Sequence, residues 1–337
     1  MVTIKDLARI ANVSPTTVSN VLHGHTNKVS KKTQREVQKA IAETQYVPNM
    51  GGRLLARHGS RIIGVIMTYA RRTEMMATRS PFYSEIIGSL ESAIRGNGYF
   101  MMLYTSGGVA ESLGLAKTWD VEGLIVLGST PEDAEEFFNE VTVPVVFIDT
   151  YGENVPNVGI DDQGAMRGLV NRLIAFGHQR IAFLTDSSIL VGVDLARYQG
   201  YRDALEHHGI EAREEDLIRI SFRDSVRSAE LDDLVAEHFR GYTVLCYSSD
   251  LYATDAMSHL IRQGVSIPGD VSVTGFDGNI LAQISTPQLM TVAQKVEDKG
   301  RVSVETLMDQ IHEGEKHLTR IELPTQLIEG KSVAKLR

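Results

Sequence analysis

The polar and apolar positions of residues 1–47 follow the period of three short helices. The second helix, over residues 14–24, begins with Ser14 as an N-cap and with Pro15 at the first helical position. Its apolar residues share one side: Val18, Val21 and Leu22. Its other side carries short hydrogen-bonding side chains and no acid: Thr16, Thr17, Ser19, Asn20 and His23. Such a helix can present its polar start to base edges in a DNA major groove, although an ordinary amphipathic surface helix has the same pattern.

Two further helices flank this segment. Thr3 begins the first, with Asp6 placed as a capping-box partner, and the connection Asn12-Val13 is so short that the first two helices must cross steeply. This order predicts a helix-turn-helix. Ser30 caps the third helix, which keeps its cations on the outer side: Lys31, Lys32, Arg35 and Lys39. They are either a rim that follows DNA phosphates or a solvated face, and the neighbouring polar helix favours the rim.

Beyond residue 60, short apolar strands alternate with amphipathic helices. The predicted strands cover residues 62–67, 99–104, 123–127, 145–148, 181–185, 244–247 and 271–274. The predicted helices cover residues 83–95, 164–176, 196–208 and 251–262. This alternation predicts an α/β body of doubly wound parallel sheets, and its two successive series imply two lobes, as in periplasmic binding proteins. Ligands of such folds bind beyond the carboxyl ends of the strands, which here means in the cleft between the lobes.

Charge divides the chain into two parts. Residues 1–60 hold nine Lys and Arg against three acids, a net charge of +6, whereas the remaining residues carry −15 within a total of −9. A small basic head on a large acidic body indicates that only the head approaches a polyanion.

Several function classes lack their sequence signals. No run approaches the ~18 apolar residues of a membrane span and the start lacks a signal-peptide core, so we expect a cytoplasmic protein without membrane contact. The single cysteine, Cys246, excludes an internal disulfide. Glycine-rich nucleotide motifs, a nucleophile elbow and metal-ligand spacing are all missing, so the sequence predicts neither an enzyme nor a metal or cofactor site.

Motifs along nearly the entire chain resemble the LacI/GalR family of bacterial repressors. In the head they are residues 3–8, 13–22 and 46–49. In the body they are residues 164–165, 176–183, 197–205, 268–277 and 286–289. The resemblance implies a sequence-specific transcriptional regulator, expected to be a repressor, whose partners are operator DNA, a small effector and a second copy of the chain.

The resemblance also implies which side chains contact DNA. In the family, residues matching Pro15, Thr16 and Asn20 read bases, and those matching Thr17 and Ser19 hold phosphate. The full set expected at the operator is Thr3, Ser14, Pro15, Thr16, Thr17, Ser19, Asn20, His23, Asn27, Arg53 and Leu55. Asn20 stands where arginine is common in the family, and His23 where asparagine is common. Because asparagine prefers adenine and arginine prefers guanine, we expect a half-site that differs at the base read by Asn20.

Residues 48–60 match the family's hinge, which becomes a helix when two copies meet over the operator. The leucine wedge that opens a central base step from the minor groove falls on Leu55. Gly51 and Gly52 replace better helix formers, each at a cost of up to ~1 kcal/mol of helix relative to alanine. We therefore expect a hinge that folds less readily and a DNA complex that is released more easily. A plain flexible linker would account for the glycines but not for Leu54 and Leu55.

The family's effector site lies at the strand tips of both lobes. The residues expected to bind the effector are Phe82, Asp149, Arg197, Phe222, Ser249 and Asp277. Carboxylates and an arginine bind the paired hydroxyls of a sugar, and an aromatic ring covers its C–H face, so the expected effector is a sugar or a sugar derivative. Asp250 is expected to cap the helix that follows it rather than to contact the ligand. Three arginines in loop 69–80 either admit an anionic ligand such as a sugar phosphate or are exposed loop residues.

These inferences define the expected organisation. A helix-turn-helix domain covers residues 1–47, a hinge 48–60, and an effector-binding body 61–337, with a first lobe of 61–160 and 291–322 and a second lobe of 161–290 and 323–337. A palindromic operator requires a homodimer, to which helix 83–95 is expected to contribute. The effector would change the lobe angle and so the hinge pairing, a coupling of typically ~1–3 kcal/mol. A sugar carrier or a sugar-modifying enzyme are the alternatives, disfavoured by the basic head and by the missing catalytic groups.

Overall fold

The computed structural model describes residues 2–22, 27, 29–46, 59–68, 80–186 and 189–336. The chain divides into two compact units, residues 1–60 and 61–337. Several predicted features lie outside the described residues: His23, Arg53, Leu55 and residues 69–79 of the arginine-bearing loop.

The described residues of the head contain three α-helices: α1 (Ile4–Ile10), α2 (Pro15–Leu22) and α3 (Lys31–Thr44). The predicted apolar stripes meet in one core whose buried members are Leu7, Ala8, Val18, Val37 and Ala40. Asn12 takes a left-handed backbone conformation with φ of 51°, and the N–H of Val13 donates to the Ala8 carbonyl at 2.9 Å, which ends α1. The predicted helix-turn-helix is confirmed.

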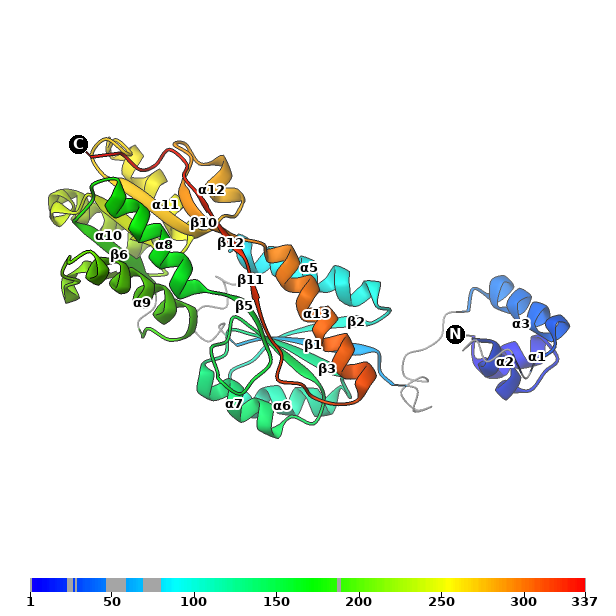
Figure 1. Cartoon of the computed structure of the whole chain (residues 1–337). Helices are drawn as coiled ribbons and strands as arrows, with labels where there is room; N and C mark the ends of the chain where they lie inside the picture. The colour runs from blue at the N-terminus through cyan, green and yellow to red at the C-terminus, as the bar shows by residue number, and fades with distance from the viewer. Residues whose placement is uncertain are drawn as a thin grey trace. The chain divides into compact units, whose positions relative to one another are not determined.

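The first lobe of the body is a six-stranded sheet with the order β11-β5-β4-β3-β1-β2 (Figure 1). Its strands are β1 (Ile62–Met67), β2 (Phe100–Thr105), β3 (Gly123–Leu127), β4 (Val145–Ile148), β5 (Asn157–Ile160) and β11 (Arg320–Leu323). Its helices are α5 (Pro81–Gly96), α6 (Val109–Thr118), α7 (Pro131–Glu140) and α13 (Val296–Glu313). Ile63 and Val65 of β1 share a core with α5 and α13, whereas Ile66 shares one with α6 and α7. Helices therefore cover both faces of the sheet.

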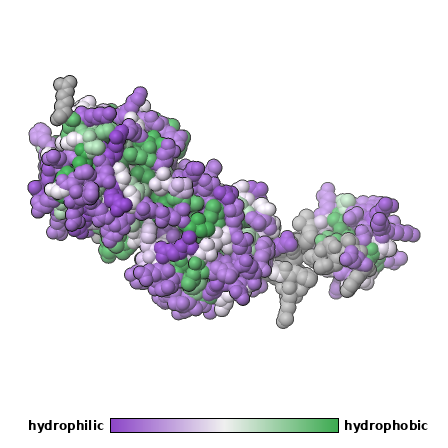
Figure 2. All heavy atoms as spheres, in the orientation of Figure 1, coloured by the Kyte–Doolittle hydropathy of each residue, from purple (hydrophilic) through white to green (hydrophobic). Residues whose placement is uncertain are grey.

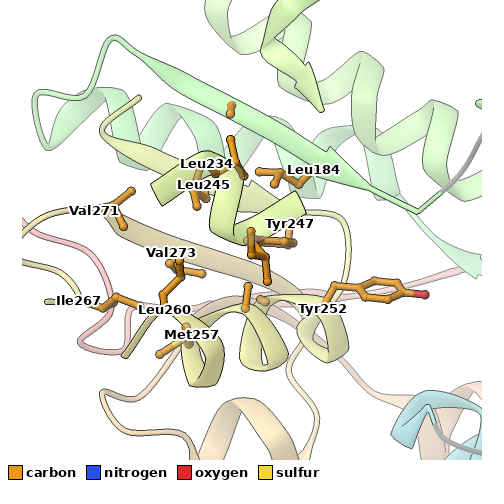
Figure 3. Packing of buried hydrophobic residues seen from close by; sticks show 14 of the residues in the cluster. Leu184, Leu234, Leu245, Tyr247, Tyr252, Met257, Leu260, Ile267, Val271 and Val273 are labelled. Atoms are coloured by element: carbon orange, nitrogen blue, oxygen red, sulfur yellow. The ribbon is translucent and has the colours of Figure 1, made fainter. Parts of the chain in front are cut away.

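The second lobe repeats this plan with the strand order β12-β10-β9-β8-β6-β7. Its strands are β6 (Ile181–Thr185), β7 (Leu217–Arg219), β8 (Val244–Tyr247), β9 (Ser272–Asp277), β10 (Met290–Gln294) and β12 (Thr325–Ile328). Its helices are α8 (Asp162–Ala175), α9 (Gly192–His207), α10 (Asp224–Ala236), α11 (Asp250–Arg262) and α12 (Ile280–Ile284), with 3-10 turns η3 (Glu214–Asp216) and η4 (His238–Gly241). Leu245 and Tyr247 pack with α10 and α11 (Figure 3), whereas Val244 and Cys246 pack with α8 and α9.

In the described part of the chain, the two lobes are joined where β5 leads into α8, β10 into α13 and β11 into β12. The expected boundaries after residues 290 and 322 fall inside β10 and β11. Because β10 pairs with β9 and β12, it belongs to the second lobe, and the chain returns to the first at α13. The prediction of parallel sheets is correct except at β12, which is antiparallel to β10.

One face of the described residues is mainly polar. Figure 2 shows hydrophilic residues over most of the visible face, with smaller apolar areas between them. None of the helices described here combines the length and the apolar character needed to cross a membrane.

We expect Gly200→Ala to destabilise the body by about 1–3 kcal/mol, because the added methyl group would overpack a helix contact. A Cβ at Gly200 of α9 would lie 2.1 Å from the Gln163 carbonyl oxygen of α8, and backbone cannot yield as a flexible side chain does. Gly168→Ala is the matched control, since a Cβ there meets no atom within 4 Å and should stabilise α8 by up to about 1 kcal/mol. Urea unfolding measures both values, and equal stability of the two variants would contradict the packing argument.

Candidate functional site

The predicted DNA-reading helix α2 is held at its start by its own cap. The Thr17 N–H donates to the Ser14 hydroxyl at 3.1 Å, and the two hydroxyls lie 2.9 Å apart. Pro15 and Thr16 are exposed, and Thr17, Ser19 and Asn20 are half-buried. The polar start of α2 therefore faces solvent while Val18 is fully buried below it.

The remaining predicted DNA contacts lie around this helix. Thr3 caps α1: its hydroxyl lies 2.7 Å from Asp6 Oδ2, and its N–H donates to the same oxygen at 3.0 Å. These bonds lower the pKa of Asp6, so its charge stays fixed beside α1. Asn27 is exposed, as are the four predicted rim cations of α3: Lys31, Lys32, Arg35 and Lys39.

Within the body, two of the predicted effector residues lie at the carboxyl ends of strands, one in each lobe. Asp149 directly follows β4 of the first lobe, and Asp277 ends β9 of the second. Both take positive φ angles, 54° and 124°, which cost energy for residues other than glycine. Backbone strain at two candidate ligand groups is typical of a functional site.

Arg197 of α9 is the central cation of this cluster, with a side chain only 9% exposed. Its Nε donates to Asp162 Oδ1 at 2.6 Å, one terminal nitrogen donates to the Ser248 carbonyl at 2.6 Å, and the same nitrogen lies 3.8 Å from Asp277 Oδ1. The guanidinium also covers the Phe276 ring at 3.7 Å. Burial opposes the charge, but the carboxylates of Asp162 and Asp277 outweigh that cost and raise the pKa of Arg197.

Asp277 is an acid whose charged form is disfavoured in the cluster. Burial raises its pKa to about 8, with a further contribution from Asp250, although Arg197 acts in the opposite direction. Its Oδ1 accepts a hydrogen bond from the Gln294 side chain at 2.9 Å. A protonated Asp277 is able to donate to a ligand oxygen, whereas an ionised one only accepts.

Asp149 binds a residue that the sequence interpretation missed, Lys299 of α13. The lysine Nζ lies 2.7 Å from each carboxylate oxygen of Asp149 and 2.6 Å from Gln294 Oε1, and Lys299 is 0% exposed. Burial raises the pKa of Asp149 even though the lysine opposes that shift. The signal that could have found Lys299 is its place on the apolar stripe of α13, three residues after Val296 and four before Ser303.

Asp162 and Tyr151 are two further site residues that the sequence interpretation missed. The Tyr151 hydroxyl donates to Asp162 Oδ2, the oxygen that Arg197 Nε leaves unbound. Asp162 is 0% exposed in the first turn of α8. Asp161 is the N-cap of α8, and nothing in the sequence around Asp162, the next residue, indicates that Asp162 is buried.

Asp250 and Ser249 have contrasting environments. Asp250 is fully buried and accepts from the Thr291 hydroxyl at 2.7 Å and from the Asn279 N–H at 3.0 Å, so it fixes the turn after β9. The expectation that Asp250 caps α11 is therefore wrong, because Asp250 is the first residue of that helix and Ser249 stands at the N-cap. The pKa of Asp250 is raised to about 6 by burial. Ser249 occupies the N-cap position of α11 without capping it, and its hydroxyl oxygen is buried with no hydrogen-bond partner among the described residues. Such an unpaired hydroxyl is suited to a ligand.

The two predicted aromatic contacts differ. Phe82, at the start of α5, faces the cluster, because Lys299 Nζ lies 5.4 Å from its ring centroid. The contacts found for Phe222 within the described chain lie elsewhere: Arg227 donates to its carbonyl at 3.0 Å, and the Arg223 guanidinium lies 5.6 Å from its ring. Phe222 therefore stays a prediction without support from the geometry.

The cluster is suited to binding rather than to catalysis. Its acids are engaged with arginine, lysine, glutamine or backbone, and the described residues contain no group of three or more His, Cys, Asp or Glu placed to hold a metal ion. What it offers a ligand is a set of buried donors and acceptors from two lobes.

Comparison with known proteins agrees with both parts of the chain. Residues 3–49 match the family model described as bacterial regulatory proteins, lacI family. Residues 170–333 match the model of a periplasmic binding protein-like domain. One curated relative is the HTH-type transcriptional repressor PurR of Vibrio atlanticus (strain LGP32), which is 31% identical over the full length of both chains.

Two solved structures extend this likeness. A lac repressor dimer bound to operator and the anti-inducer ONPF matches with a TM-score of 0.85 at 25% identity, covering 99% of each chain. A complex of the transcriptional regulator CelR with cellobiose matches with a TM-score of 0.70 at 27% identity, covering 98% of this chain and 100% of that one.

We expect Asp277→Asn to flatten the pH dependence of folding stability between about pH 6.5 and 8. With its pKa raised from 3.8 to about 8, Asp277 keeps a proton in the folded chain that the unfolded chain has released. Stability should therefore fall as pH rises toward 8, by up to about 1.4 kcal/mol per pH unit. Urea unfolding at a series of pH values measures the slope. Asp309→Asn, on the exposed side of α13, should keep the wild-type slope, and an unchanged slope in Asp277→Asn would contradict the assignment.

Proposed function

Because the chain belongs to the LacI family of bacterial transcriptional regulators, which are not enzymes, we propose that its head binds a palindromic operator as a homodimer and that a small ligand between the lobes controls this binding. The observation that carries the proposal is the pairing of an outward-facing polar helix in a basic head with a buried two-lobe cluster of polar groups. The activity expected is repression of transcription.

The DNA-binding half of the proposal rests on α2 and its neighbours. Pro15, Thr16 and Asn20 are assigned to base reading, and Thr17 and Ser19 to phosphate. The exposed cations of α3 supply further phosphate contacts. The lac repressor to which this chain is similar was solved as a dimer on operator, which supports a two-fold assembly here. A regulator that binds genomic DNA works in the cytoplasm, which is our proposed location.

The ligand-binding half rests on the interlobe cluster. We assign ligand contacts to Asp149, Arg197, Ser249, Asp277 and Phe82. The contacts of Arg197 with Asp277 and of Lys299 with Phe82, and the unpaired Ser249 hydroxyl, support this assignment. The similar CelR regulator was solved with cellobiose, which supports a sugar or sugar derivative as the ligand of this chain. Both described cations of the cluster are already paired with acids, which favours an uncharged ligand.

We expect Asn20→Ala to weaken operator binding by about 1–3 kcal/mol and to relax the preference for one base pair in each half-site, because one side chain reads that base. Selection from random DNA with the wild-type dimer provides the operator, and gel shifts then measure the affinities.

Lys32→Ala serves as the contrasting variant. It should weaken binding to all sequences alike and reduce the slope of log K against log salt by roughly 0.9, since it removes one phosphate contact. Absence of binding to any selected duplex at low ionic strength would refute the DNA-binding half.

For the ligand, we expect a neutral mono- or disaccharide to raise the melting temperature of the wild-type chain by mass action, whereas sugar phosphates should not. A panel that includes ribose, cellobiose and glucose 6-phosphate tests this in a thermal-shift assay. Asp277→Asn should lose the shift while keeping its fold, and Asp309→Asn should retain it. Stabilisation by the phosphate alone would overturn the assignment of an uncharged ligand.

A further inference from the structure

Lys299 is a buried cation to which neither the predicted site nor the proposed ligand contacts assign a role. It is 0% exposed, and its ammonium group has three acceptors within 2.7 Å: both oxygens of Asp149 and Oε1 of Gln294. Since a lysine ammonium has three N–H donors, all of them are satisfied by these contacts.

These acceptors come from different lobes. Asp149 follows β4 of the first lobe, and α13, which carries Lys299, packs on the same lobe. Gln294 is the last residue of β10, in the second sheet. The bond from Lys299 to Gln294 therefore crosses between the lobes, beside the point where β10 leads into α13.

Gln294 also binds a second residue of the second lobe. Its Nε2 donates to Asp277 Oδ1 at 2.9 Å, and Asp277 Oδ1 lies 3.8 Å from Arg197. A second crossing returns to the first lobe, because Arg197 binds Asp162 and the Tyr151 hydroxyl donates to the same carboxylate. Tyr151 lies two residues after Asp149, so the contacts form a closed ring that crosses between the lobes twice.

Folding stability alone does not account for this lysine. A buried ion pair is often no more stabilising than apolar side chains of similar volume, and the stripe of α13 on which Lys299 lies is otherwise largely apolar or small. What an apolar residue would not supply is a directed bond to Gln294 across the lobe boundary.

We propose that Lys299 is a positioning residue that holds Asp149 and Gln294 together across the lobe boundary and thereby fixes the arrangement of the two lobes. The ring contains Asp149, Arg197 and Asp277, which are also the proposed ligand contacts. A ligand that binds these three residues therefore competes with the contacts that hold the two lobes together. This consequence rests on the proposed function.

The test measures the distance between the lobes in the full chain without DNA or ligand. Lys117→Cys on α6 and Glu206→Cys on α9 place exposed spin labels on the first and second lobes, and the native Cys246 stays unlabelled because it is fully buried. Pulsed electron paramagnetic resonance then gives the interlobe distance distribution. The variant Gln294→Leu removes the crossing bond and the bond from Gln294 to Asp277, and leaves the Lys299–Asp149 pair in place. The double variant Lys299→Met with Asp149→Asn removes the pair without leaving an unpaired buried charge.

We expect both variants to give a distribution about twice as broad as wild type, or shifted by several ångströms, because hinge motion is no longer restrained. The single variant Gln294→Glu keeps an acceptor for Lys299 and should therefore keep the narrow distance distribution of wild type. Arg301→Met removes an exposed cation from the same helix and should change nothing.

The decisive variant is whichever of Gln294→Leu and the Lys299→Met, Asp149→Asn double variant keeps the wild-type circular dichroism spectrum. If its interlobe distance distribution equals that of wild type, the proposal is overturned. A lowered melting temperature with an unchanged distance would assign Lys299 a purely structural role. Failure of the chain to bind operator or sugar would refute the proposed function and leave this result unaffected.

Discussion

A guanidinium buried among carboxylates is the constraint on which the cleft depends. Arg197 cannot be left unpaired away from water, so Asp162, Asp277 and the Ser248 carbonyl must converge on it from separate elements of the second lobe. Those groups occupy strand tips and a helix start, which fixes the edge of the lobe that faces its partner lobe. Burial raises the pKa values of Asp149, Asp250 and Asp277, and a neighbouring carboxylate adds to the shift of Asp149 and of Asp277.

Local pattern was sufficient to predict most of the framework. Strands β1, β3, β4, β6 and β8 begin and end where the apolar runs do, because a strand buried on both faces is a continuous apolar segment. The three helices of the head were also predicted from the sequence, because the caps at Thr3 and Ser30 and the apolar stripe through Val18 involve residues only a few positions apart. Asp149, Arg197 and Asp277 were predicted from a family resemblance, and the structure places them in one cluster.

What the pattern missed depends on contacts between distant residues. Polar, charged or glycine residues interrupt the apolar residues of β5, β7 and β12, and β7 is only half-buried, so none of them has a clear apolar signal. Helices α6 and α10 show weak apolar stripes and were not assigned, whereas α7 has a stripe as pronounced as that of α5 and was overlooked. Lys299 and Asp162 become site residues only when their partners, far away in sequence, close around them. Phe222 shows the opposite failure, because its assignment came from the resemblance and its contacts lie with Arg223 and Arg227 instead.

Neither sheet of the body is built from one continuous stretch of chain. β11, at Arg320–Leu323, completes the first sheet beside β5, and β12, at Thr325–Ile328, completes the second beside β10. The core of the head lies within residues 2–46, so the head is able to fold soon after it emerges from the ribosome, at about 5–20 residues per second. Both lobes must wait, with strand edges unpaired, until residues 320–328 have been made. Completion of both sheets is thereby coupled to the synthesis of one short segment.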